Sequence, residues 1–369
     1  MAQSHYRRML RSMKTQKTPC FFGFSCLPEL LPSGSSVRTV VLLAVVSGWT
    51  CGVTAAPPGG APDGLPKLEI PLPTLGGKQF WTDYLFLHQW RIQRSAVTGQ
   101  FRLLDPNNLQ HAAGGYVECR AKLEEIKHGR NLPPMNGKAV ILLHGLVRTR
   151  SSMGKLAKHL QQQGEYQVLN MSYASTQHEV ARHAKALHSI VRQLDDVEEI
   201  NFVGHSLGNI VVRHYLYDQM HREDGRPPDK RIKRFVMIAP PNHGSLLAAT
   251  VAEIGAYKTV TGKAGRELGQ QWARLEGKLA TPPCQFGIIA GGLGNDAGFN
   301  PLLEGDDDGT VSVASTRLAG ATDFVLVPAL HSFITSDSKV LDYTLRFLQK
   351  GYFVSADKQQ PVRKDEGSR

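Results

Sequence analysis

The segment Gly-His-Ser-Leu-Gly places Ser206 between Gly204 and Gly208. It follows the apolar run 200–203 and opens a helix-like stretch, 207–220. At such a strand-to-helix turn a serine is held in a strained backbone conformation that exposes its hydroxyl, and small neighbours let the turn pass close to adjacent elements. The pattern predicts a nucleophile elbow, with Ser206 as the nucleophile and Gly204 and Gly208 as its glycines.

A serine hydroxyl needs a base within hydrogen-bond reach, and that base needs a carboxylate that fixes its tautomer. In proteins built around this turn, the three groups follow in the order serine, acid, histidine. His214, His221 and His243 come too early in the chain, whereas His331 follows the last expected strand. We therefore predict that His331 is the base for Ser206.

Three consecutive aspartates, Asp306 to Asp308, precede Gly309 in the loop before that last strand. Runs of charge are usually solvated, so the orienting acid has to be chosen among them. We predict Asp308, because Gly309 allows a sharp turn and the ordered sequence 310–313 would hold this carboxylate inward. Asp307 is the alternative.

Acyl transfer passes through a tetrahedral oxyanion, which requires backbone N–H donors that are already in place. Leu207 supplies one donor, because it follows the serine directly at a helix N-terminus. The second donor is expected in the loop after the strand 139–143, and we assign it to the N–H of Leu146. His144 and His205 are expected to brace these two loops by hydrogen bonding.

Strand and helix patterns alternate with short connections from residue 138 to 352. This alternation predicts an α/β fold with a mostly parallel central sheet and helices on both faces. The strand 139–143 is apolar throughout, which is typical of a central strand buried on both sides. Residues 245–280 interrupt the alternation with helical, partly apolar sequence, and we predict a cap over the face that carries the serine.

The remaining segments have different compositions. A basic segment followed by an apolar run shorter than the ~20 residues of a comfortable membrane span predicts a signal peptide, or an uncleaved N-terminal membrane segment. We therefore expect export to the periplasm or medium, or tethering to a membrane. The predicted divisions are the signal or anchor (1–56), a Pro/Gly-rich linker (57–79), an N-terminal extension with a hairpin but too few apolar residues for an independent core (80–137), the catalytic domain (138–352) and a polar tail (353–369).

The whole chain has 369 residues, of which 41% are hydrophobic and 20% charged, as in ordinary globular proteins. Its net charge of +11 comes without interleaved basic and aromatic residues, so we expect no nucleic-acid binding but an attraction to anionic membrane surfaces. Outside residues 1–56, Cys119 and Cys284 can form one disulfide or remain free thiols. No spacing of Cys and His is typical of zinc, and neither a metal nor a cofactor is predicted.

Together these motifs resemble the bacterial α/β-hydrolase lipases and esterases, in particular the branch with an H-G-L oxyanion loop. The resemblance implies ester hydrolysis with Ser206, Asp308 and His331 as the triad. Calcium-dependent members carry an aspartate shortly after the histidine, whereas Ser332 and Phe333 follow here, so no structural calcium is predicted. The matching blocks lie at 142–146, 204–208, 239–245, 308–311 and 331–333.

These observations predict a serine hydrolase that cleaves a small-molecule or lipid ester through an acyl-enzyme. An acyltransferase would use the same three residues with an alcohol acceptor in place of water. A catalytically idle fold that binds a lipid or a protein partner through the cap is the third interpretation, although a binding module has no physical need for all three groups.

Overall fold

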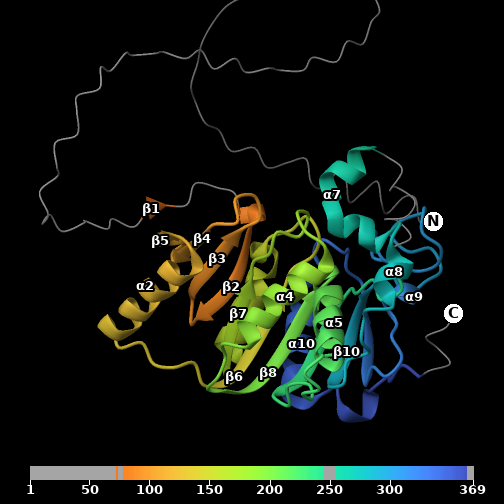
Figure 1. The fold of residues 1–369 in the computed structure, drawn as a ribbon. Coiled ribbons are helices and arrows are strands. Elements are labelled where there is room, and N and C mark those ends of the chain that lie inside the picture. Colours follow the sequence, from red (N-terminus) through yellow and green to blue (C-terminus); the bar gives the residue numbers. More distant parts are fainter. Residues whose placement is uncertain (1–71, 74–77, 245–254, 364–369) are drawn as a thin grey trace, which may run out of the picture. The chain divides into compact units, whose positions relative to one another are not determined.

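The computed structural model describes residues 72–73, 78–244 and 255–363. A six-stranded sheet forms its centre, and every neighbouring pair of its strands is parallel (Figure 1). This confirms the predicted α/β class. In spatial order the strands are β11 (Asp323–Val327), β10 (Gln285–Gly291), β9 (Ile232–Ile238), β8 (Val197–His205), β6 (Gly137–Leu143) and β7 (Tyr166–Met171).

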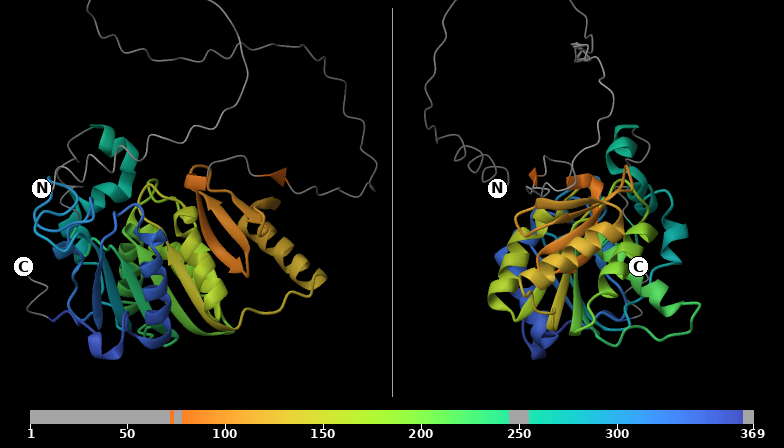
Figure 2. Two further views of the ribbon diagram at one scale, coloured as in Figure 1. Left: turned by 180° about the vertical axis from the view of Figure 1, so that it is seen from behind. Right: turned by 60° about the vertical axis from the view of Figure 1, so that its left-hand side comes forward.

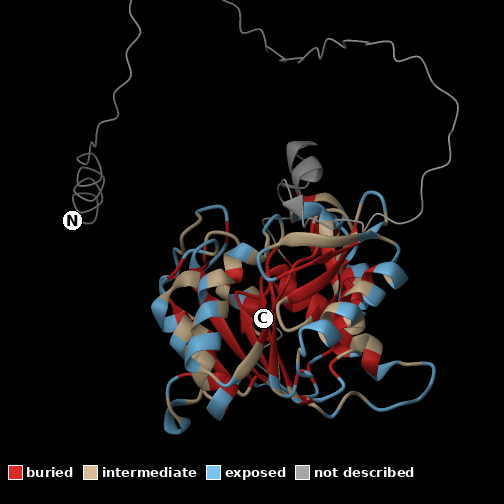
Figure 3. Ribbon diagram, turned by 90° about the vertical axis from the view of Figure 1, so that its left-hand side faces the viewer, coloured by how far each residue is buried: buried red, intermediate tan, exposed pale blue. Residues whose placement is uncertain are grey.

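Helices cover both faces of this sheet (Figures 1 and 2). Alternate side chains of β6 belong to two separate buried clusters: Ile141 packs in one and Leu142 in the other. Because both faces of the strand are covered, no polar residue interrupts its apolar run. The buried interior lies between the exposed outer faces of the helices (Figure 3). The Ile141 side holds α4 (Val180–Val191) and α5 (Leu207–Met220), and the Leu142 side holds α3 (Gly154–Gln163) and α10 (Ser338–Lys350).

The segment 80–137 forms a second, antiparallel sheet covered by the helix α2 (Tyr116–Gly129). The expected hairpin pairs β3 with β4. The low apolar content predicted no independent core, and the six buried side chains of the segment form only a small cluster between this sheet and α2: Leu85, Trp90, Ile92, Leu103, Cys119 and Leu123. The order is β1 (Leu72–Pro73), β5 (Leu109–Gly114), β4 (Phe101–Leu104), β3 (Trp90–Ser95) and β2 (Trp81–Leu87).

Hydrogen bonds join this small sheet to the end of β7. The N–H of Asp83 in β2 donates to the carbonyl of Ser172 at 2.9 Å. In return, the N–H of Ser172 donates to the Asp83 carboxylate at 2.6 Å. The N–H of Ala174 donates to the hydroxyl of Thr82 at 3.1 Å. The segment is therefore fixed to the edge of the six-stranded sheet.

The chain after α10 packs against the sheet up to residue 363, although its composition predicted a polar tail. Phe353 is fully buried and Val362 is 3% exposed. The carboxylate of Asp323 accepts hydrogen bonds from the N–H groups of Phe353 at 2.7 Å and Gln360 at 2.9 Å. Two buried apolar side chains and these hydrogen bonds anchor the segment.

The insertion after β9 contributes the helices α7 (Gly255–Leu268) and α8 (Trp272–Glu276). Helix α7 is kinked at Gly262, where a Cβ would lie 1.8 Å from the carbonyl oxygen of Thr176. The insertion is thus seated against the loop after β7. Its first part (245–254), the signal or anchor segment (1–56) and nearly all of the linker (57–79) lie outside the described residues.

Two further observations concern the part of the chain that the structure describes. No helix in it has the length and apolar character needed to cross a membrane. Cys119 and Cys284 are both free thiols, so they do not form the disulfide that the sequence left open. Burial raises the pKa of Cys119 to about 11 and that of Cys284 to about 12, which keeps both thiols protonated at neutral pH.

Candidate active site

Ser206 lies at the turn between β8 and α5, with φ 52° and ψ −121°. A positive φ outside glycine costs about 1–3 kcal/mol and needs support from its surroundings. Here the N–H of Ser206 donates to the carbonyl of Ile238 at 3.0 Å. The side-chain amide of Asn209 donates to the carbonyls of Ser206 and Ile238, at 3.1 and 3.0 Å. These bonds hold the serine in its strained conformation.

The two glycines of the turn are required by close approaches of the backbone. A Cβ on Gly204 would lie 2.7 Å from the backbone nitrogen of Asn209. A Cβ on Gly208 would lie 2.4 Å from the carbonyl oxygen of Leu143 in β6. Both obstacles are main-chain atoms that cannot rotate away, so a side chain at either position would push α5 off the sheet.

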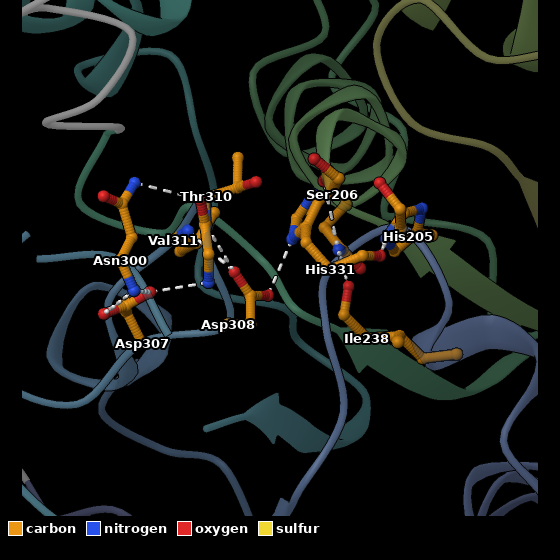
Figure 4. A network of polar contacts seen from close by, with 12 residues as sticks. His205, Ser206, Ile238, Asn300, Asp307, Asp308, Thr310, Val311 and His331 are labelled. Carbon is orange, nitrogen blue, oxygen red and sulfur yellow. Dashed lines mark hydrogen bonds and ion pairs between the residues drawn. The ribbon is translucent and has the colours of Figure 1, made fainter. Parts of the chain in front are cut away.

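His331 and Asp308 come from loops after β11 and β10 and meet beside Ser206 (Figure 4). The Nδ1–H of His331 donates to Oδ2 of Asp308 at 2.7 Å, and the His331 backbone N–H donates to the Asp308 carbonyl at 2.8 Å. Oδ1 of Asp308 accepts from the N–H groups of Thr310 and Val311, at 3.0 and 2.8 Å. The imidazole is thereby fixed with Nε2 as the acceptor.

The two preceding aspartates hold the loop instead of reaching the histidine. Asp307 is fully buried, and its carboxylate accepts from the N–H of Gly309 at 2.6 Å and from that of Asn300. Asp306 accepts from the N–H groups of Leu293 and Gly294 at 2.7 and 2.8 Å. The expectation that a charge run is mostly solvated is therefore wrong here: each carboxylate has its own backbone partners.

Ser206 and His331 line the same cavity, which has a volume of about 360 Å³. Leu146 lies in its wall, and the loop backbone before it is close to the serine: a Cβ on Gly145 would lie 3.2 Å from Cβ of Ser206. Leu207 is the first residue of α5, so its N–H belongs to those that have no partner within the helix. Both predicted oxyanion residues thus adjoin the serine.

His144 and His205 support the two loops, as the sequence predicted. Nδ1–H of His144 donates to the carbonyl of Gly145 at 2.9 Å, and its ring stacks on Tyr173 with 4.2 Å between centroids. Nε2–H of His205 donates to the carbonyl of His331 at 3.1 Å. Burial lowers the pKa of His144 to about 4 and that of His205 well below its usual value, so both rings are neutral at pH 7.

Buried neutral histidines should make the protein less stable as the pH falls from about 6.5 toward 4. Burial lowers the pKa of His183 to about 3 and that of His144 to about 4, whereas unfolded imidazoles titrate near 6.5. The unfolded state therefore binds more protons in this window, and the free energy of unfolding decreases with decreasing pH. Each of these two histidines should contribute a loss of about 2 kcal/mol by pH 5.

Denaturant unfolding at pH 7, 6 and 5 measures this effect. His183→Gln should reduce the slope of unfolding free energy against pH by about one proton. His128 is exposed on α2, so His128→Gln is the matched control for the loss of one histidine. A free energy of unfolding that is constant between pH 7 and 5 would contradict the interpretation.

Sequence reasoning missed several residues of the cavity. Thr261 and Leu268 reach it from α7, and Arg148 lies in its wall. A guanidinium N–H of Arg148 donates to the hydroxyl of Ser332 at 2.5 Å, which joins the loop after β6 to the loop that carries His331. Only the position of Arg148 shortly after the H-G-L block was a signal; the contact with Ser332, 184 residues away, had none.

A family model described as a domain of unknown function (DUF7379) matches residues 106–254. No curated protein matches the chain significantly. Among solved structures, phospholipase PlaB from Legionella pneumophila is 21% identical (TM-score 0.38, 50% of this chain and 45% of that chain), so this chain spans less than half of that protein. The mature Bacillus licheniformis lipase BlEst2 is 18% identical (TM-score 0.41, 59% and 89%), and the metagenomic carboxyl esterase MGS0156 is 19% identical (TM-score 0.41, 54% and 66%).

The topology of the main sheet and the position of Ser206 identify the fold. All six strands of the main sheet run in parallel, and a serine at positive φ follows the central strand β8. Asp308 and His331, the predicted partners of that serine, are hydrogen-bonded to each other on loops after two later strands, in the order acid and then histidine. This topology is that of the α/β-hydrolase fold.

Proposed function

We propose that the chain is a serine hydrolase that cleaves carboxylic esters through an acyl-enzyme on Ser206. The main supporting observation is the hydrogen bond between His331 and Asp308, made on the wall of the cavity that also contains Ser206. This bond requires that the loops after β10 and β11 be ordered relative to each other, and it gives His331 the tautomer that a general base needs. The α/β-hydrolase fold is consistent with ester hydrolysis but does not select it among other reactions.

In the proposed reaction, Oγ of Ser206 attacks the ester carbonyl while Nε2 of His331 accepts its proton. Asp308 holds the ring and stabilises the imidazolium that forms. The N–H groups of Leu207 and Leu146 bind the oxyanion of the tetrahedral intermediate. When the intermediate collapses, His331 returns the proton to the departing alcohol, and water then attacks the acyl-enzyme by the same route.

The substrate class is proposed from the chemistry of the cavity wall. Apolar groups make up most of the cavity surface. Among the described residues that line the cavity, Arg148 has a charged side chain and His331 is the candidate base. Such a wall favours an apolar acyl group. Phe333 and Leu330, next to His331, are 68% and 41% exposed and would suit contact with a lipid surface. The apolar residues of the wall are Leu146, Val147, Pro241, Leu268 and Val311.

Fluorophosphonate labelling combined with ester hydrolysis tests the proposal. We expect one adduct per folded chain by intact-protein mass, and turnover of nitrophenyl esters whose rate depends on acyl length. Folded protein that forms no adduct and hydrolyses none of these esters would favour the interpretation as a catalytically idle binding fold.

A further inference from the structure

A second cavity, of about 240 Å³, lies between the small antiparallel sheet and the edge strand β7. Three arginines line it: Arg91 from β3, Arg102 from β4 and Arg150 from the 3₁₀ turn Arg150–Met153 before α3. Their side chains come from both sides of the junction, so this cavity exists only because the small sheet is fixed to the hydrolase sheet.

The positive charge around this cavity exceeds the negative charge. The carboxylate nearest to the arginines belongs to Asp83, which is fully buried with Oδ1 3.6 Å from Nη1 of Arg91. Asp83 also accepts from the side chain of Gln93 at 2.8 Å and from the N–H of Ser172. The described residues that line the cavity include no acidic side chain. Three guanidinium groups against one carboxylate leave an excess of about two positive charges.

Neutral groups hold Arg102, whereas the described residues offer no hydrogen bond to the buried Nη1 of Arg150. Nε and Nη2 of Arg102 donate to the side-chain oxygen of Gln93 at 3.0 and 2.8 Å, and the guanidinium lies 3.8 Å above the ring of Trp81. Nη1 of Arg150 is buried and has no hydrogen-bond partner among the described residues. A buried charged donor without an acceptor is unfavourable, because it has lost water and gained nothing in return.

The pKa values of two of these arginines are lowered, as expected for like charges in a partly buried cavity. Burial, with the charge of Arg91 as the next cause, lowers the pKa of Arg102 and of Arg150 to about 10. Both groups still carry their charge at neutral pH. Three like charges in one partly desolvated space repel each other, and an anion in that space would remove the repulsion.

We propose that this cavity is a binding site for a phosphate group, held by Arg150, Arg102 and Arg91. A phosphate monoester carries about two negative charges at pH 7, which matches the excess, and several oxygens that planar guanidinium groups can contact in pairs. The buried Oδ1 of Asn170, which has no partner among the described residues, can accept from a hydroxyl of the ligand. The group can belong to a soluble phosphate or to a lipid headgroup.

This site is separate from the candidate active site. Arg148 lines the cavity of Ser206, and two residues later Arg150 lines the phosphate cavity. One short loop therefore borders both cavities. The proposal does not depend on the proposed hydrolase function, because it concerns binding and can be tested without any ester.

Thermal unfolding of the full chain tests the proposal, with sodium phosphate compared with sodium chloride at matched ionic strength. We expect 10 mM phosphate to raise the Tm by roughly 2–4 °C, as for a ligand with a Kd near 1 mM. Arg150→Gln should lose this rise while its Tm without phosphate stays equal or increases, because the repulsion among the three guanidinium groups decreases and the buried donor Nη1, which has no partner among the described residues, is removed. Arg192 is exposed at the end of α4, and Arg192→Gln should keep the full rise.

Phosphorus NMR titration of glycerol 1-phosphate provides the second measurement, and sedimentation with vesicles that contain phosphatidic acid, a lipid phosphate monoester, distinguishes a headgroup from a soluble ligand. If Arg150→Gln does not fold, Arg150→Lys keeps the charge without the planar fork and should bind at least tenfold more weakly. Binding to either source that depends on Arg150 supports the proposal. No binding to any of these probes, or equal binding by the Arg150 variants, overturns it.

Discussion

Ser206→Ala is expected to lower kcat for ester hydrolysis by about 10⁶-fold and to eliminate the fluorophosphonate adduct. Without Oγ no acyl-enzyme can form, and only the residual effects of binding and of the oxyanion donors remain. The fold should be retained, because alanine keeps the Cβ and the bonds that support the turn involve the backbone of residue 206 and the side chain of Asn209.

The matched control for this prediction is Ser189→Ala on α4, which should keep both the adduct and the turnover. Intact-protein mass and initial rates on nitrophenyl esters measure the outcome, with circular dichroism as a check of folding. A folded Ser206→Ala protein that still forms the adduct would show that another residue is the nucleophile.

Asp308→Asn is expected to lower kcat by about 10⁴-fold while the protein stays folded. The asparagine oxygen can still accept from the N–H groups of Thr310 and Val311, which preserves the loop. Its NH₂ group would face Nδ1 of His331 and would select the tautomer with the proton on Nε2. That tautomer cannot accept the proton of the serine hydroxyl.

Asp307→Asn is the matched control, because it makes the same change one residue earlier. The Asp307 carboxylate contacts the backbone of Gly309 and Asn300 and not the histidine, so this variant should lose stability and keep most of its kcat. Comparing kcat with Tm for both variants separates the two roles. The assignment of Asp308 as the orienting acid would be contradicted if Asp308→Asn kept kcat within tenfold of the unchanged protein. A larger loss of kcat in Asp307→Asn than in Asp308→Asn would indicate Asp307 as the orienting acid.

The central sheet was predictable because its local patterns and its tertiary environment agree. The all-apolar run in β6 indicated a strand buried on both faces, and it lies between β7 and β8 with helices on each side. The helix α5 begins at Leu207 and ends at Met220, as the sequence indicated. The chain order of acid and histidine was also enough to bring Asp308 and His331 together.

Features that depend on pairs of residues far apart in the sequence were not predictable. The bonds between Asp83 and Ser172 join residues 89 positions apart, and nothing local to either residue indicates them. The three arginines of the second cavity likewise resemble ordinary surface residues until the two sheets meet. Burial of Val362 depends on a backbone pairing with Ala321, in a segment whose composition alone favours solvent.

The hydrogen bond from His205 to the carbonyl of His331 has a consequence for how this chain can change in length. His205 immediately precedes the candidate nucleophile, and the bond spans 126 positions. The distance between the candidate nucleophile and the candidate base is therefore fixed by a hydrogen bond between the two loops that carry them, and not only by the segment that connects these loops. A change of length between the two loops should therefore leave this contact in place wherever the core packing of Leu268, Leu275 and Leu279 is retained.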